Sequence, residues 1–139
     1  MIMRGDQLEG ACMDAESLKA AGSSVGTAGL IVIDEDTDLM KVIARISMFY
    51  YHESCGQCTP CREGTGWLWK ILKRFEKGEG RMGDIDLLMD IANNIEGNTI
   101  CALGDAAAWP VQSMILRFRD EFEKRVKTVP PRMEQEAAA

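Results

Sequence analysis

Four successive segments between residues 37 and 126 repeat apolar side chains at the spacing of an amphipathic helix, and this pattern limits the folds open to the chain. They run from about Thr37 to Glu53, from Cys61 to Gly78, from Asp84 to Gly97 and from Ala106 to Val126. Short links between helices make sequential neighbours antiparallel. The sequence therefore predicts a mainly α-helical fold built on a four-helix bundle.

Two details of these helices are specific predictions. In the first helix, six apolar residues recur at helical spacing and are expected to form its apolar face: Leu39, Val42, Ile43, Ile46, Phe49 and Tyr50. Pro110 is expected in the first turn or so of the last helix, where a missing backbone N–H costs least.

Residues 1–35 have a different character, rich in Gly, Ala and Ser, with one short helical pattern at 13–21. Leu30–Ile33 is a β-branched segment between Gly29 and an acidic turn, which is typical of a strand. Because one strand cannot form a sheet alone, we expect residues 1–35 to be the end of a β-containing domain from a longer chain. Residues 128–139 lack an apolar period and are expected to form a disordered tail.

Charge and composition argue against several functional classes. The formal net charge of −6 argues against nucleic-acid binding, which needs clustered Lys and Arg against phosphates. No run of eighteen apolar residues is present, so no transmembrane helix is expected. Arg4, Asp6 and Glu9 interrupt the start of the chain, unlike a secretory signal. We therefore expect a reducing compartment, where cysteines are more often metal ligands or free thiols than disulfides.

Three of the five cysteines form a C-x2-C-x2-C run, Cys55, Cys58 and Cys61, between the first two predicted helices. Thiolates at this spacing can each reach a different iron of an iron–sulfur cube. Cys101 is the candidate fourth ligand, because it falls in the link between the third and fourth helices, at the same end of an up-down-up-down bundle. The pattern predicts one [4Fe–4S] cluster on these four residues.

Other roles for these residues are less well supported. A zinc site with four cysteine ligands is the main alternative, but structural zinc usually draws on two separate C-x2-C pairs. Cys12 is interpreted as a free thiol, and His52 as a helix-end residue near terminal carbonyls rather than a ligand or proton carrier. The chain has no nucleotide-binding glycine loop, and its single histidine gives no support to a catalytic triad. No catalytic residue is predicted, and the sequence favours an electron relay.

Two longer motifs resemble a known family. The run His52–Gly64 (HESCGQCTPCREG) closely resembles the cluster loop of the NADH-binding flavoprotein subunits of respiratory complex I. The run Ile95–Val111 (IEGNTICALGDAAAWPV) is similar to the segment of that family that carries the fourth ligand. The resemblance extends from about Met13 to Arg125, and related subunits occur in NAD-linked hydrogenases and formate dehydrogenases.

The resemblance implies that Cys55, Cys58, Cys61 and Cys101 ligate a [4Fe–4S] cluster that receives electrons from FMN, reduced by NADH, and passes them toward quinone. It implies a helical cluster-binding domain over 36–127, preceded by the end of a ubiquitin-like β-grasp domain over 1–35. The family's flavin and NADH domain is not among these 139 residues, so NADH oxidation would need another domain.

The implied partners are the flavin domain, a thioredoxin-like [2Fe–2S] subunit and a large iron–sulfur subunit, without direct membrane insertion. The implied location is the cytoplasmic side of a bacterial inner membrane, or the matrix side in mitochondria. Two alternatives remain open: the equivalent subunit of an NAD-linked hydrogenase or formate dehydrogenase, and a zinc-stapled structural or interaction module.

Overall fold

The computed structural model describes residues 1–127, and the described part of the chain is mainly helical, as predicted. A short 3-10 helix, η1 (Gly5–Leu8), is followed by five α-helices: α1 (Ala15–Ala20), α2 (Leu39–Glu53), α3 (Thr59–Glu76), α4 (Asp84–Ile95) and α5 (Leu103–Glu123). These residues include no strand, only an isolated bridge between Gly80 and Val126. The predicted tail, 128–139, lies outside the described residues.

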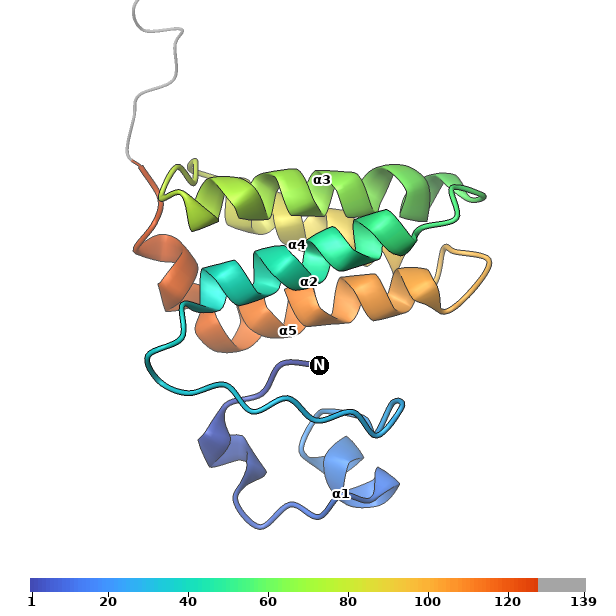
Figure 1. Ribbon diagram of the computed structural model, residues 1–139, viewed down its shortest axis with the longest axis vertical. Helices are drawn as coiled ribbons and strands as arrows, with labels where there is room; N and C mark the ends of the chain where they lie inside the picture. Colours follow the sequence, from blue (N-terminus) through green and yellow to red (C-terminus); the bar gives the residue numbers. More distant parts are fainter. Residues whose placement is uncertain (128–139) are drawn as a thin grey trace, which may run out of the picture.

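Helices α2 to α5 lie side by side, each packed against the next helix along the chain, and α5 packs back against α2 (Figure 1). The ends of the helices follow local chemistry. Asp38 caps α2 by accepting a hydrogen bond from the Met40 N–H at 3.0 Å. Gly83, with a φ of 87°, precedes α4 in a left-handed conformation that suits glycine.

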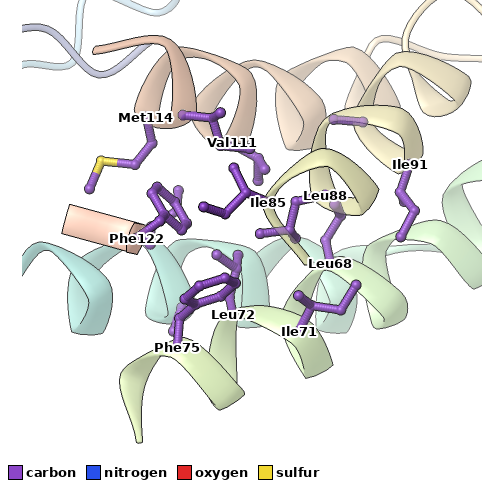
Figure 2. Close-up of a cluster of buried hydrophobic side chains, with 14 of the residues drawn as sticks. Leu68, Ile71, Leu72, Phe75, Ile85, Leu88, Ile91, Val111, Met114 and Phe122 are labelled. Atoms are coloured by element: carbon purple, nitrogen blue, oxygen red, sulfur yellow. The ribbon is translucent and has the colours of Figure 1, made fainter. Parts of the chain in front are cut away.

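The hydrophobic core lies between these four helices, which all contribute side chains to it (Figure 2). Phe75 of α3 and Phe122 of α5 pack edge to face, with ring centroids 5.1 Å apart. The largest fully buried aliphatic side chains are Met40, Ile43, Leu68, Leu72, Leu88, Ile95 and Met114. Full burial of one such side chain contributes about 1.5–3 kcal/mol. The four helices therefore hold one another through a shared core.

The face of α2 that meets the core agrees only in part with the predicted one, because Ile43 is buried and Leu39 packs against the core. Phe49 is 55% exposed, and Val42 and Ile46 are only half-buried. The buried positions of α2 are Met40, Ile43, Ala44 and Ser47, which are spaced i, i+3, i+4 and i+7. A pattern search weighted by hydrophobicity passes over Ala and Ser, yet small side chains let neighbouring helices approach closely.

The predicted position of Pro110 in the first turn is wrong. Helix α5 begins at Leu103, and Pro110 lies in its interior. The residues before Ala106 already belong to the helix, with Asp105 as the acidic residue of its first turn. An acidic side chain is favourable there because the first N–H groups of a helix carry partial positive charge.

Residues 1–8 lie against the C-terminal half of α5. The Ile2 N–H donates to Ser113 Oγ at 3.0 Å. The Arg4 guanidinium lies 5.2 Å from the centroid of the Phe118 ring and donates to the Arg117 carbonyl at 3.1 Å. Phe118 has non-helical angles, φ −134° and ψ 36°, so α5 bends where the N-terminal segment contacts it. The sequence held no local signal for this pairing.

The predicted strand at Leu30–Ile33 does not form in the structure. Leu30, Ile31 and Val32 are 64%, 84% and 85% exposed, and no described segment pairs with their backbone. A strand needs a neighbour whose N–H and C=O groups complete the ladder, so β-branched composition alone is not sufficient. The helical pattern at 13–21, in contrast, is confirmed by α1.

Candidate metal centre

The cysteines of the predicted cluster lie at one end of the bundle. Cys55 and Cys58 belong to the link between α2 and α3, and Cys61 follows in the first turn of α3. Cys101 belongs to the link between α4 and α5. Both links lie at the right-hand end of the bundle in Figure 1, because α2 and α4 run toward that end and α3 and α5 run away from it.

The four thiols differ in exposure. Cys61 is only 6% exposed, Cys58 is half-buried, and Cys55 and Cys101 are exposed. Within residues 1–127, no three His, Cys, Asp or Glu side chains are grouped closely enough to hold a metal ion. The structure therefore brings the four cysteines to one end of the bundle without gathering their sulfur atoms into a closed site.

The start of α3 is formed by the cysteine run itself. Cys58 is the N-cap residue, with extended backbone angles of φ −104° and ψ 140°, and Thr59 and Pro60 are the first helical residues. Proline suits this position because its φ is preset and its missing N–H would be unpaired there. The Cys58 side chain makes no capping hydrogen bond. The positive end of the α3 dipole is thus available to stabilise negative charge on nearby sulfur atoms.

Cys61 has the most structured surroundings of the four. Its Sγ lies 3.2 Å from the Ser54 hydroxyl oxygen, and its carbonyl accepts a hydrogen bond from Thr65 Oγ1 at 2.7 Å. The Gly56 N–H donates to Ser54 Oγ at 3.4 Å, and Gly56 has a φ of 77°, which favours glycine. Sequence reasoning missed Ser54 and Thr65, because serine and threonine beside cysteine form no recognisable pattern.

Arg62 connects the cysteine link to the first turn of α3. Its Nη1 donates to the Gly56 carbonyl at 2.9 Å, its Nη2 to Thr59 Oγ1 at 3.3 Å, and its Nε to the Glu63 carboxylate at 3.0 Å. One guanidinium thus fixes two points of the loop and places positive charge beside it. It also lines an open pocket of about 380 Å³, whose other lining residues include Trp67 and Lys70.

The link that carries Cys101 is held by its own set of contacts. The Gly97 N–H donates to Asp105 Oδ1 at 2.7 Å, and Thr99 Oγ1 donates to the Cys101 carbonyl at 2.9 Å. A Cβ on Gly104 would overlap the Thr99 side chain, so this close approach requires glycine. The link is therefore ordered around the backbone of Cys101, while the thiol itself stays exposed.

Glu96, at the end of α4, joins this link to α5. Hydrogen bonds from Gln112 at 2.7 Å and from Trp109 Nε1 at 2.6 Å lower the pKa of Glu96, because both stabilise the carboxylate. Across the bundle end, a Cβ on Gly64 of α3 would lie 2.7 Å from the Ile95 side chain of α4. The helices that carry the two links are thus in close contact just beneath the cysteines.

The two remaining candidates lie outside the cysteine set. Cys12 precedes α1 and is exposed, and its backbone N–H donates to Ser17 Oγ at 2.8 Å. His52 lies in the last turn of α2, where its ring centroid is 5.7 Å from that of Tyr51 and 6.4 Å from that of Trp69.

A protein-family model described as the NADH-ubiquinone oxidoreductase-F iron-sulfur binding region matches residues 41–125, which include both cysteine links. The F-type subunit of the NADH-quinone oxidoreductase of Rickettsia bellii (strain OSU 85-389) is 60% identical over 119 residues, covering 86% of this chain and 28% of that relative. Its counterpart in Rickettsia massiliae (strain Mtu5) is 58% identical over 116 residues, covering 84% and 28%. The chain thus spans 28% of the length of these curated relatives.

Among solved structures, the chain is similar to an NAD+-reducing [NiFe]-hydrogenase in the H2-reduced state, with a TM-score of 0.67 at 28% identity. That match covers 77% of this chain and 19% of the hydrogenase chain. The air-oxidised form gives a TM-score of 0.65 at 29% identity, covering 77% and 20%.

Proposed function

Because the chain belongs to the family of NADH-ubiquinone oxidoreductase-F iron-sulfur binding regions, we propose that it binds one [4Fe–4S] cluster through Cys55, Cys58, Cys61 and Cys101. The observation that carries the proposal is the position of both cysteine links at one end of the bundle, within the residues that the family model matches. The proposed function is a one-electron relay.

The chemistry of these residues fits such a cluster. Four thiolates are the usual ligand set of a [4Fe–4S] cluster. Cys55 and Cys101 are exposed, so their side chains can turn toward a common centre without disturbing the core. The first turn of α3 and the Arg62 guanidinium offset part of the negative charge that such a centre carries. When bound, the cluster supplies a site that gains and loses one electron.

The chain's own residues position the thiols and keep water away from part of the site. The α2–α3 link, tied by Arg62 to the Gly56 carbonyl, holds three thiols within seven residues. Packing of α3 against α4 under the links keeps water from the buried side of Cys61. Exclusion of water strengthens the effect of nearby dipoles and charges on the reduction potential.

We propose the setting from the names of the relatives together with what the resemblance of the two cysteine motifs implies. In an NADH-quinone oxidoreductase, electrons from NADH would arrive through FMN in a separate domain and leave along an iron–sulfur chain toward quinone. The partners would be that flavin domain, a thioredoxin-like [2Fe–2S] subunit and a large iron–sulfur subunit. Among the described helices, none is both long and apolar enough to cross a membrane. Peripheral attachment on the cytoplasmic or matrix side is part of the proposal.

The domain division is also proposed. Residues 36–127 would form the cluster-binding domain, and residues 1–35 would complete a β-grasp domain. The exposure of Leu30, Ile31 and Val32 supports this division, because an apolar, β-branched segment left open to solvent can pair with a neighbouring strand.

The test is the content of iron and acid-labile sulfide in the 139-residue chain, reconstituted without oxygen, with low-temperature electron paramagnetic resonance after dithionite reduction. We expect about four of each per chain and the signal of a reduced [4Fe–4S] cluster. One zinc per chain and no sulfide would contradict the proposal and favour a structural module.

A second candidate is the equivalent subunit of an NAD-linked hydrogenase or formate dehydrogenase. The similarity to the NAD+-reducing [NiFe]-hydrogenase structures favours it. The neighbouring genes separate the two settings. Hydrogenase or formate dehydrogenase genes beside this one, without genes for membrane-arm subunits, would contradict the complex I assignment.

A further inference from the structure

We propose that Ser54 is a positioning residue for the cluster, whose hydroxyl donates a hydrogen bond to Sγ of Cys61 and raises the reduction potential of the bound cluster. This inference rests on the proposed function. It concerns a residue outside the four proposed ligands. It also distinguishes Cys61 from the other three cysteines, because only the Cys61 sulfur atom would accept a hydrogen bond from a side chain of the described residues.

The contact between the two residues is fixed from both sides. Ser54 Oγ lies 3.2 Å from Cys61 Sγ. The Ser54 backbone closes α2, where its N–H donates to the Tyr50 carbonyl at 3.1 Å. Cys61 is held in the first turn of α3, and Thr65 Oγ1 donates to its carbonyl at 2.7 Å. Two helices therefore bring the hydroxyl and the sulfur atom together, independently of any metal.

In the metal-free structure either Ser54 Oγ or Cys61 Sγ could be the donor. The Gly56 N–H, which can only donate, points at Ser54 Oγ at 3.4 Å. This contact uses one lone pair of the hydroxyl oxygen and leaves its proton available for the sulfur atom of Cys61. A cysteine that ligates iron is a thiolate without a proton, so the Ser54 hydroxyl must be the donor in the loaded protein.

The hydrogen bond changes the relative energies of the two oxidation states. Reduction adds negative charge to the cluster and its thiolates, and a donor to a ligand sulfur atom stabilises the more negative state more strongly. Cys61 is 6% exposed, so water competes little for this sulfur atom. Among residues 1–127, no other cysteine sulfur has a hydrogen-bonding side chain. The effect on the potential should therefore depend on Ser54.

The experiment compares two pairs of side chains at position 54 in the reconstituted full chain. Serine and Ser54→Thr carry a hydroxyl, whereas Ser54→Ala and Ser54→Val do not, and threonine and valine have nearly the same shape. Ser113→Ala is the matched control, since Ser113 is a buried serine whose hydroxyl donates to the Trp109 carbonyl in α5. Iron and sulfide content is measured first, and the midpoint potential is then taken from a redox titration followed by electron paramagnetic resonance.

At the wild-type midpoint potential, we expect the ratio of reduced to oxidised cluster to fall about tenfold in Ser54→Ala and Ser54→Val, which is about 59 mV for a one-electron couple. Ser54→Thr and Ser113→Ala should keep the wild-type potential. Loaded Ala and Val variants with unchanged potentials would overturn the inference, as would a Thr variant shifted as far as Val. Failure of both hydroxyl-lacking variants to hold iron would also overturn it, because the hydroxyl would then serve assembly. Absence of a cluster from the wild type would instead contradict the proposed function.

Discussion

The two ends of the bundle are held in different ways. At one end, the ion-pair end, Asp84, the first residue of α4, accepts from Arg74 of α3 at 2.7 Å, and Asp38 before α2 accepts from Arg125 after α5 at 2.8 Å. At the other, the cysteine end, no hydrogen bond or ion pair among the described residues joins the link at 54–58 to the link at 96–102. At the ion-pair end, side chains of the chain itself join neighbouring helices. At the cysteine end, the two links would be joined only through a group bound by the thiols.

The largest expected effect at the cysteine end is the loss of the cluster in Cys101→Ala. Iron and acid-labile sulfide should fall from about four of each per chain to well below one, because one iron loses its thiolate. The free energy of unfolding of the metal-free chain should change by less than about 0.5 kcal/mol, because Cys101 is exposed. Metal analysis and urea denaturation measure the two effects.

The matched control for that substitution is Cys12→Ala, which removes an exposed thiol outside both links. It should leave the iron and sulfide content unchanged. A full cluster in Cys101→Ala would mean that the fourth ligand lies elsewhere. The link at 96–102 would then not be joined to the cluster at this end of the bundle.

At the ion-pair end, the largest effect should follow from Asp84→Ala. The Asp84 side chain is 6% exposed and accepts two hydrogen bonds from Arg74 and one from the Arg81 N–H. Its removal leaves Arg74 without a partner, and we expect a loss of about 3 kcal/mol in the free energy of unfolding. The exposed pair of Asp86 and Arg119 supplies the control, for which Asp86→Ala should cost less than about 0.5 kcal/mol. If urea denaturation gave similar losses for both variants, the buried pair of Asp84 and Arg74 would not be the main contact that stabilises this end.

Asp38 should make the ion-pair end sensitive to acid. Desolvation raises its pKa, but hydrogen bonds from Arg125 and from the Met40 N–H outweigh this, and the pKa of Asp38 lies below its ordinary 3.8. The folded state therefore gains from the ionised carboxylate at all pH values above about 3.8, and this gain is lost as the pH falls through the lowered pKa.

Asp38→Ala should accordingly cost about 1 kcal/mol at pH 7, the usual cost of losing an N-cap, and less at pH 3. Urea denaturation at both pH values measures the difference. Asp36→Ala, at an exposed carboxylate two residues earlier, is the control and should cost little, because surface substitutions away from specific contacts have small effects. A cost of Asp38→Ala that stays constant down to pH 3 would exclude the ionised carboxylate as its cause.

The smallest effect concerns Arg62. Arg62→Ala removes the hydrogen bond to the Gly56 carbonyl, and amide hydrogen exchange in the link at 54–58 should speed up about fivefold, as expected for about 1 kcal/mol. Lys70→Ala, also exposed and on the same helix, should leave this exchange unchanged. Arg62→Lys separates the effect of charge from that of hydrogen-bond geometry, because lysine keeps the positive charge but lacks the planar guanidinium. Exchange at the wild-type rate in Arg62→Ala would show that the loop is held by other contacts.

The positions of the helices could be predicted from the sequence, because they depend on the local spacing of apolar residues. The four bundle helices and α1 follow from helical spacing, and the helix boundaries placed Cys101 in a link between two helices. The buried face of α2 was harder to predict, because Ala44 and Ser47 pack there without being strongly apolar. Pro110 was misplaced because the start of α5 has no strong apolar repeat.

Features that depend on distant partners could not be predicted in this way. Ile2 meets Ser113 across more than a hundred residues, and neither residue indicates the other locally. Leu30–Ile33 has the composition of a strand but finds no partner among the described residues. The Ser54 hydroxyl beside Cys61 arises from the meeting of two helix ends, which sequence spacing does not resolve.

The division of the four proposed ligands between two links would also impose an order on cluster assembly. Cys55, Cys58 and Cys61 lie within one short loop, so the entropic cost of bringing them together is small even in a partly folded chain. Cys101 is 40 positions beyond Cys61, and it reaches the same place only after α3 and α4 have formed an antiparallel pair. A complete cluster could thus form only after folding, because the proposed fourth ligand reaches the other three only when the bundle is complete.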